Sequence, residues 1–231
     1  MATVLITGAN RGLGLEFCRQ YAREGWQVIA CSRSLDNALE LTHLADAHAN
    51  IQLEVLDVAK FEQIDALSQK LKDLPIDVLL NNAGIYPDNA SNGFGQIDYR
   101  AWTESLLVNT QAPVKMAEAF LPQLKNSDKK LIVAISSLMG SMADNNSGGS
   151  IFYRSSKAAL NAAMKSLAID LEDQSVGVLI FHPGWVKTDM GGPAALINPE
   201  QSIAGMCNVI KNFLLNQSGN FVKYDGTPMP W

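Results

Sequence analysis

Short, nearly continuous apolar runs alternate along this chain with longer segments in which apolar residues recur at helical spacing. Runs with so few polar residues are typical of strands that are buried on both faces of a sheet. Six such runs occupy residues 3–7, 27–31, 51–56, 77–81, 130–136 and 176–181. The pattern therefore predicts six strands inside the protein.

The segments between these runs carry the periodicity of helices that have one apolar face. The predicted helices cover residues 14–25, 35–49, 60–74, 99–125 and 155–174. Strands that alternate with helices form a parallel sheet with helices on both faces, joined by right-handed crossovers. Because the 231 residues contain no linker, low-complexity run or internal repeat, we expect one α/β domain over residues 1–231.

The net charge and the hydropathy of the chain argue against two classes of partner, nucleic acids and membranes. The formal net charge is −5 and no basic run stands out, so a nucleic-acid partner is not expected. No run longer than about eight residues is continuously apolar, whereas a transmembrane helix needs about 20. The chain also starts without a basic segment followed by a long apolar stretch. We expect a cytoplasmic protein that binds neither nucleic acid nor a membrane.

The cysteines and histidines are too few and too scattered to predict a metal site. They are Cys18, Cys31, Cys207, His43, His48 and His182. An odd number of cysteines without CxxC spacing is typical of a reducing compartment. We expect reduced, buried thiols and no metal.

A glycine-rich turn follows the first predicted strand. The sequence TGANRGLG places Gly8, Gly12 and Gly14 between this strand and a helix. Gly8 permits a tight turn, Gly12 lets the backbone approach a pyrophosphate, and Gly14 lets the helix pack against the strand. The free N–H groups at the start of the helix favour an anion. The order of these elements predicts a dinucleotide site, although the spacing is GxxxGxG rather than GxGxxG.

The sequence YRSSK places Tyr153 and Lys157 four residues apart, on one face of a predicted helix. Such a pair also occurs by chance on solvated helices. However, a phenol has an ordinary pKa of about 10, and a nearby ammonium lowers this pKa by stabilising the phenolate. The pair is therefore a candidate for acid–base chemistry.

Several segments, in the same order, resemble the short-chain dehydrogenase/reductase family over essentially the whole chain. They are TGANRGLG, NNAG at 81–84, Asn109, the serines at 136 and 137, and YRSSK. The resemblance implies a Rossmann fold with a doubly wound parallel sheet of about seven strands. The segment HPGWVKTDMGG and the terminal YDGTPMPW resemble the branch that contains the C-factor signalling protein and the Sniffer-type carbonyl reductases.

The resemblance implies the catalytic residues Asn109, Ser137, Tyr153 and Lys157. In the family the tyrosine exchanges a proton with the substrate oxygen, and the lysine holds the nicotinamide ribose hydroxyls. The serine binds the substrate oxygen; Ser136 is the competing assignment, and Ser137 is preferred because the second serine of such a pair usually has this role. Asn109 would support a water on a proton relay, although by itself it is equally a polar residue satisfied inside a helix.

The resemblance also implies a cofactor site at the carboxyl ends of the strands. There Asp57 would bond the adenine amino group, and the Val186 backbone and the Thr188 hydroxyl would hold the nicotinamide carboxamide. The implied cofactor-binding residues are Gly8, Asn10, Arg11, Gly12, Leu13, Gly14, Ser32, Arg33, Asp57, Val58, Asn82, Ala83, Gly84, Tyr153, Lys157, Pro183, Gly184, Val186 and Thr188.

Charge favours NADP(H) over NAD(H). NAD-specific relatives usually carry an acidic residue at the end of the second strand, whereas this chain has Ser32 followed by Arg33. Arg11 stands in the glycine-rich turn, and two guanidinium groups at one place would bind a 2′-phosphate. Either arginine is alternatively a solvated surface side chain.

The segment 185–198 is expected to cover the substrate as a short lid, with Gly191 and Gly192 as hinges. The apolar side chains expected near it are Ile85, Tyr86, Met139, Trp185 and Met190. They predict an open, apolar pocket for a small carbonyl or alcohol substrate.

The predicted function is NADPH-dependent reduction of a ketone, aldehyde or quinone to the alcohol, with Tyr153 as general acid. The alternative is a nucleotide-sensing regulatory or signalling protein with incidental turnover. The predicted helices at 99–125 and 152–172 have apolar faces that would permit a homodimer or homotetramer.

Overall fold

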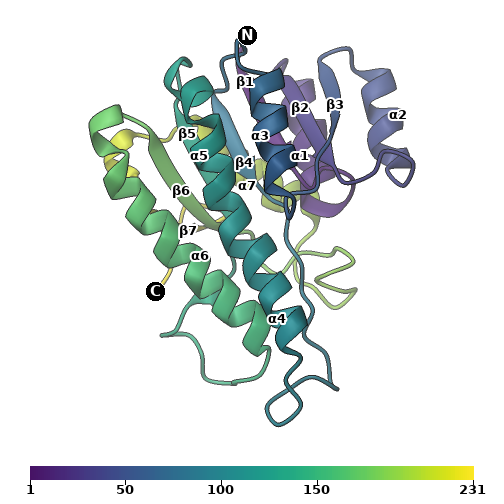
Figure 1. Ribbon diagram of the computed structural model, residues 1–231, viewed down its shortest axis with the longest axis vertical. Helices are drawn as coiled ribbons and strands as arrows, with labels where there is room; N and C mark the ends of the chain where they lie inside the picture. Colours follow the sequence, from purple (N-terminus) through teal and green to yellow (C-terminus); the bar gives the residue numbers. More distant parts are fainter.

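Seven parallel strands form one sheet in the order β3-β2-β1-β4-β5-β6-β7 (Figure 1). The computed structural model describes all residues from 1 to 231. The strands are β1 (Thr3–Thr7), β2 (Gln27–Ser32), β3 (Ile51–Val55), β4 (Val78–Asn81), β5 (Leu131–Ile135), β6 (Gly177–His182) and β7 (Asn220–Lys223). The strand order reverses between β1 and β4, so the sheet is doubly wound, as expected.

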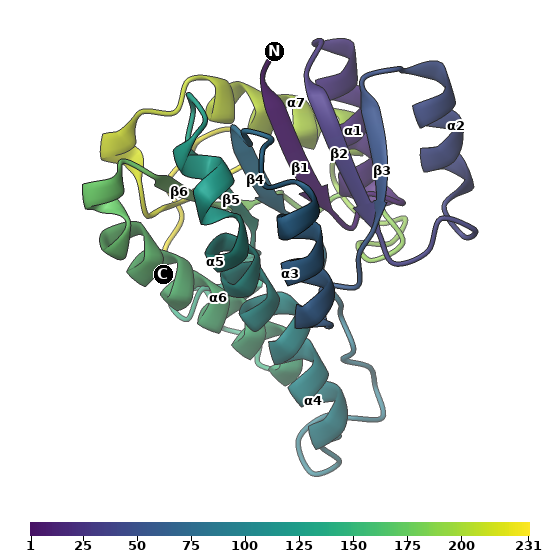
Figure 2. The same ribbon diagram turned by 45° about the horizontal axis from the view of Figure 1, so that its top comes forward.

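Helices cover both faces of this sheet. One face carries α1 (Gly12–Arg23), α2 (Leu39–Ala47) and α7 (Pro199–Lys211). The other carries α3 (Phe61–Lys70), α4 (Tyr99–Leu106), α5 (Ala112–Lys125) and α6 (Ile151–Asp170). Figure 2 shows α3, α5 and α6 side by side, with α4 extending beyond the edge of the sheet. No helix is long and apolar enough to cross a membrane.

Every strand except β3 contributes to two cores, and β3 contributes Ile51 to one of them. In β1, Leu5 points into the core beneath α3, α5 and α6, whereas Val4 and Ile6 point into the core beneath α1 and α7. The two cores hold 26 and 25 buried residues, so both faces of the sheet are equally covered. This explains why the strands read as continuous apolar runs rather than alternating ones.

The C-terminal quarter contains two elements that the apolar pattern did not predict. β7 has only four residues, of which Phe221 and Val222 are buried, so it leaves too short a pattern to identify. α7 carries Ile203, Met206 and Ile210 at helical spacing, so its sequence does contain the apolar pattern of a helix. α7 completes the core on its face, while β7 forms one edge of the sheet.

Two predicted helices differ from the observed ones in ways that concern the site. The predicted helix at 99–125 is divided by a π-helical turn, Leu107–Gln111, between α4 and α5. The helix expected to begin at residue 155 begins at Ile151, so Tyr153 lies in its first turn. Propensity did not predict the earlier start, because residues 147–150 read as a loop and the carboxylate that caps the helix, Asp88, lies far away in the sequence.

The turn after β1 leaves no room for a side chain at Gly14. A Cβ built there would lie 2.2 Å from the Gly8 carbonyl oxygen and 2.6 Å from Asn82 Nδ2. We expect Gly14→Ala to force α1 away from β1 and to lower the free energy of unfolding by about 1–3 kcal/mol. Urea unfolding measures this change.

The matched control is Gly93→Ala, because a Cβ at Gly93 meets no atom within 4 Å. Equal unfolding midpoints for Gly14→Ala and Gly93→Ala would contradict the close packing described for this turn.

Candidate active site

The ends of β1 and β4 are joined by side-chain hydrogen bonds. The Thr7 hydroxyl accepts the backbone N–H groups of Asn82 and Ala83, both at 3.0 Å. In return, Asn82 Nδ2 donates to the carbonyl oxygens of Thr7 at 2.8 Å and Gly8 at 3.1 Å. The NNAG segment therefore holds the glycine-rich turn in place at the point where the strand order reverses.

The glycine-rich turn approaches its neighbours closely through its backbone. Gly8 has φ +66°, and a Cβ there would lie 2.9 Å from Ala83 Cα. Gly12 also has a left-handed φ of +54°. α1 begins after Arg11 with no side-chain cap and no acidic residue in its first turn, so its first N–H groups are free. This arrangement fits a pyrophosphate at the helix N-terminus.

Tyr153 and Lys157 lie together in a buried position on α6, at the carboxyl end of β5. The two residues are 8% and 4% exposed, and Lys157 Nζ lies 5.6 Å from the centroid of the Tyr153 ring. Nζ donates to the carbonyl oxygen of Ile135 at 2.8 Å. The ammonium therefore lies over the ring rather than at the phenol oxygen.

Burial controls the protonation of this pair. The pKa of Tyr153 is raised to about 12, mainly by burial and to a smaller extent by the Tyr86 phenol, while hydrogen bonding to Ser137 lowers it. Burial also lowers the pKa of Lys157 to about 8. The expected depression of the phenol pKa by the ammonium is absent, because desolvation dominates and Nζ faces the Ile135 carbonyl. The phenol is neutral at pH 7 and can donate a proton.

The two serines after β5 have different environments. Ser136 is buried, and its hydroxyl donates to Asn161 Oδ1 at 2.5 Å. Ser137 begins a short 3₁₀ turn, and its hydroxyl accepts the N–H of Met139 at 3.1 Å, while its interaction with the Tyr153 phenol lowers the pKa of that phenol. The structure therefore places Ser137, and not Ser136, beside the phenol.

Asn109 lies in the π-helical turn and is completely buried. Its Oδ1 accepts the N–H of Ile85 at 2.8 Å, and its Nδ2 donates to the Ile85 carbonyl at 2.9 Å and to the Ser156 hydroxyl at 3.0 Å. A Cβ built on Gly84 would lie 3.2 Å from Asn109 Oδ1 and 3.6 Å from Lys157 Nζ. The amide therefore fastens the segment after β4 next to the lysine.

The two arginines at the cofactor edge differ in their partners. Arg11 forms an ion pair of 2.7 Å with Asp189, in the loop after β6, and both side chains are exposed. Arg33 follows β2, is exposed and has no ion-pair partner. The Ser32 hydroxyl donates to the Ser34 carbonyl at 3.0 Å. Arg33 is thus the free cation at this edge, whereas Arg11 is shared with the loop.

Other predicted cofactor residues lie in the turns that border this edge. Asp57 follows β3, and its Oδ1 accepts the N–H of Ala59 at 3.1 Å, while Val58 is buried. Asn10 is half-buried in the turn before α1, and Leu13 is half-buried in the first turn of α1. The turn after β3 and the turn before α1 therefore both place side chains at the carboxyl edge of the sheet.

The loop after β6 folds back onto the glycine-rich turn. Val186 pairs with Ile197 in an isolated β-bridge, and the Thr188 hydroxyl accepts the N–H of Gly191 at 3.1 Å. A Cβ on Gly12 would lie 3.5 Å from Thr188 Cγ2. A Cβ on Gly191 would lie 2.0 Å from the Val186 carbonyl oxygen, so close packing explains this glycine better than a hinge does.

The turn into this loop is equally constrained. Gly184 has φ +86°, and a Cβ there would meet Ile197 Cδ1 at 2.7 Å. The Pro183 carbonyl accepts the Ser202 hydroxyl at 2.6 Å, which ties the turn to α7. The Pro183–Gly184 turn therefore directs the loop across the carboxyl edge of the sheet.

The apolar side chains expected around the substrate are mostly exposed. Tyr86, Trp185 and Met190 are 40%, 51% and 52% exposed. Trp185 is held by a bond of 2.7 Å from its Nε1 to the Gly191 carbonyl. Ile85 and Met139 are half-buried. Of these five residues, Tyr86 is in contact with Tyr153, with a distance of 4.8 Å between the ring centroids.

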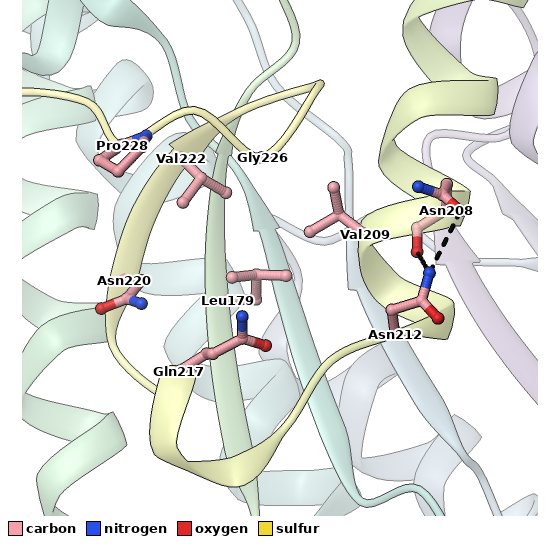
Figure 3. A pocket seen from close by; sticks show the side chains of 9 residues that line it. All are labelled: Leu179, Asn208, Val209, Asn212, Gln217, Asn220, Val222, Gly226 and Pro228. Atoms are coloured by element: carbon pink, nitrogen blue, oxygen red, sulfur yellow. Dashed lines mark hydrogen bonds between the residues drawn. The ribbon is translucent and has the colours of Figure 1, made fainter.

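A separate cavity of about 340 Å³ lies between α7 and the β6–β7 edge (Figure 3). Its lining residues are Leu179, Asn208, Val209, Asn212, Gln217, Asn220, Val222, Gly226 and Pro228. None of the predicted catalytic residues borders this cavity, so it is distinct from the site around Tyr153.

Sequence reasoning missed His182, which was assigned no role. Its Nδ1 accepts the N–H of Leu138 at 3.1 Å, directly after Ser137. Burial, followed by the charge of Lys223, lowers the pKa of His182 to about 4, so Nδ1 remains an acceptor at neutral pH. His182 thereby supports the turn that carries Ser137. Its place directly before the Pro-Gly pair was the available signal.

Comparison with known proteins agrees with this geometry. A family model described as short chain dehydrogenase matches residues 2–196. The C-signal protein of Myxococcus xanthus is 40% identical over 157 residues, which are 68% of this chain and 93% of that protein.

Two solved structures resemble the chain along its whole length. Carbonyl reductase Sniffer of D. melanogaster has a TM-score of 0.93 and 38% identity, and the match covers 100% of both chains. An NADPH-bound carbonyl reductase from chicken fatty liver has a TM-score of 0.92 and 32% identity, over 100% of this chain and 99% of that one. These similarities confirm the expected C-factor and Sniffer-type resemblance. The chain belongs to the short-chain dehydrogenase/reductase family.

Proposed function

We propose that this protein is an NADPH-dependent reductase of a ketone, aldehyde or quinone carbonyl. The observation that carries the proposal is the neutral, buried phenol of Tyr153 beside the Ser137 hydroxyl. A proton donor and a hydrogen-bond donor at one point suit a carbonyl oxygen that gains negative charge. The exposed ring of Tyr86, 4.8 Å from the ring of Tyr153, supports a substrate with an apolar part beside the phenol.

The residues at the carboxyl edge fit NADP(H). The uncapped start of α1 at Gly12, whose left-handed φ favours glycine, would receive the pyrophosphate. Arg33 would bind the 2′-phosphate, and Arg11 would join it by leaving Asp189. When bound, NADPH supplies the hydride for the carbonyl carbon. The known NADPH-bound carbonyl reductase of similar structure supports this choice.

In this proposal each residue of the site has a separate task. Tyr153 donates its proton to the carbonyl oxygen, and Ser137 donates a hydrogen bond to the same oxygen. Lys157 binds the ribose hydroxyls with its ammonium and holds positive charge beside the phenol. Asn109 fastens the segment after β4, and the π turn around it would present a backbone carbonyl to a water that returns the proton through Lys157.

A second candidate function is a nucleotide-dependent signalling protein whose turnover is incidental. The observation that favours it is the 40% identity to the C-signal protein. The two functions differ in what Tyr153 must do, because a binding module needs the cofactor site but not the phenol proton.

Tyr153→Phe tests the first function directly. We expect kcat for carbonyl reduction to fall about 10²- to 10⁴-fold, because the proton donor is lost. The dissociation constant of NADPH should change little. NADPH absorbance with a panel of ketones, aldehydes and quinones measures kcat, and a binding titration measures the dissociation constant of NADPH. Tyr99→Phe is the control, at a tyrosine that is 69% exposed. If Tyr153→Phe retains wild-type turnover, the reductase mechanism is wrong.

Arg33→Asp tests the choice of cofactor. The substitution removes a charge-assisted bond worth about 1.5–3 kcal/mol, so NADPH affinity should fall about 10- to 100-fold while NADH affinity holds. Arg23→Asp, with the same charge change at the far end of α1, is the control. Titration of both nucleotides into each variant gives the answer. An unchanged ratio of NADPH to NADH affinity would refute the assignment of Arg33.

Lys157 should make NADPH binding depend on pH. Its pKa is lowered to about 8, and a ligand that binds the ammonium raises that pKa. Affinity should therefore be constant below pH 8 and fall as the pH rises above it, because free protein that has lost the proton must regain it. Titrations between pH 6 and 10, with Lys157→Met as a pH-independent reference, measure this effect. A wild-type affinity that does not decline above pH 8 would count against the proposed role of Lys157.

A further inference from the structure

The first turn of α6 carries Tyr153 but lacks a cap from its own sequence. The residue before the helix, Ser150, has a left-handed φ of +45° and makes no side-chain cap. Gly148 and Gly149 precede it, both with φ +65°. The N–H groups of the first helical residues have no intrahelical partner, and a local cap normally accepts them. Something else must hold Tyr153, the third residue of this helix.

Asp88 supplies the missing cap from a distant part of the chain. Its Oδ1 accepts the N–H of Phe152 at 3.0 Å, and its Oδ2 accepts the N–H of Tyr153 at 2.8 Å. A carboxylate at a helix N-terminus is favoured by both the hydrogen bonds and the helix dipole. Asp88 thus binds the backbone of the proposed proton donor across 65 residues of sequence.

Tyr86 reinforces the same contact. Its hydroxyl and the Ser150 hydroxyl are hydrogen-bonded at 2.6 Å. Its ring lies 4.8 Å from the Tyr153 ring, at an angle of 49°. The segment after β4 therefore contacts Tyr153 at both its backbone and its ring, and also holds the residue before its helix.

This segment is itself anchored next to the site. Asn109 holds both backbone groups of Ile85, at 2.8 and 2.9 Å. After Asp88 the chain enters residues 89–95, which are mostly exposed. Asp88 thus joins the segment that Asn109 anchors to the first turn of α6.

We propose that Asp88 is a positioning residue for Tyr153. It holds the first turn of α6 in helical geometry, so that the phenol meets the substrate oxygen beside Ser137. This inference rests on the proposed reductase function. A proton donor that is displaced by about 1 Å loses about 10²-fold in rate, so a cap at this position matters for turnover.

The test compares Asp88→Ala with Asp98→Ala. Asp98 is the matched control, because its carboxylate caps α4 by accepting the N–H groups of Arg100 and Ala101. We expect Asp88→Ala to lower kcat about 10- to 100-fold. We also expect faster amide hydrogen exchange within residues 151–157, measured with NADPH present. Asp98→Ala should change neither, and KM and the NADPH dissociation constant should hold in both variants.

Asp88→Asn keeps one carbonyl oxygen, so its kcat and its amide exchange should lie between those of the wild type and of Asp88→Ala. This variant replaces Asp88→Ala in the test if the alanine variant does not fold. Equal exchange in the Asp88 and Asp98 variants would overturn the cap. Faster exchange with unchanged kcat would overturn the positioning role. If the wild type turns over no carbonyl substrate, the reductase proposal fails by itself, and exchange within residues 151–157 still decides whether Asp88 holds the helix.

Discussion

The buried ammonium of Lys157 is the constraint on which the rest of the site depends. Lys157 is 4% exposed, no carboxylate pairs with it, and its only hydrogen bond goes to the Ile135 carbonyl. Removing a charge from water costs several kcal/mol unless other groups compensate. The backbone at Gly84 and Gly140 lies close against Lys157 at this place. Lys157 Nζ therefore has further N–H groups that a ligand with hydroxyl oxygens could accept.

The same low polarity determines the state of Tyr153. Because burial outweighs the field of the ammonium, the phenol keeps its proton at neutral pH. That state is useful only if the phenol is held in one place. His182 supports the turn of Ser137, Asn109 holds the segment after β4, and Asp88 holds the first turn of α6, which carries Tyr153. The site is therefore a set of backbone contacts around two buried titratable side chains.

The cofactor edge is organised by close backbone approach rather than by charge. Gly8 and Gly14 leave no space for a Cβ, and Asn82 bonds the carbonyls of the same turn. The Arg11–Asp189 pair then links this turn to the loop after β6. Since both partners are exposed, the pair is weak. The loop after β6 and the glycine-rich turn thus share one cation.

The sequence by itself determined the layered α/β fold, six of the seven strands and the identity of the glycine-rich turn. These follow from local patterns, because a strand buried on both faces must be apolar throughout and a tight turn needs glycine. The tertiary structure adds a physical reason to prefer Ser137 to Ser136, because the Ser136 hydroxyl is used in a hydrogen bond to Asn161. It also formed the π turn at Asn109, started α6 at Ile151, and brought Asp88 to Tyr153. Those features depend on contacts between residues far apart in the chain, and local periodicity carries no information about such contacts.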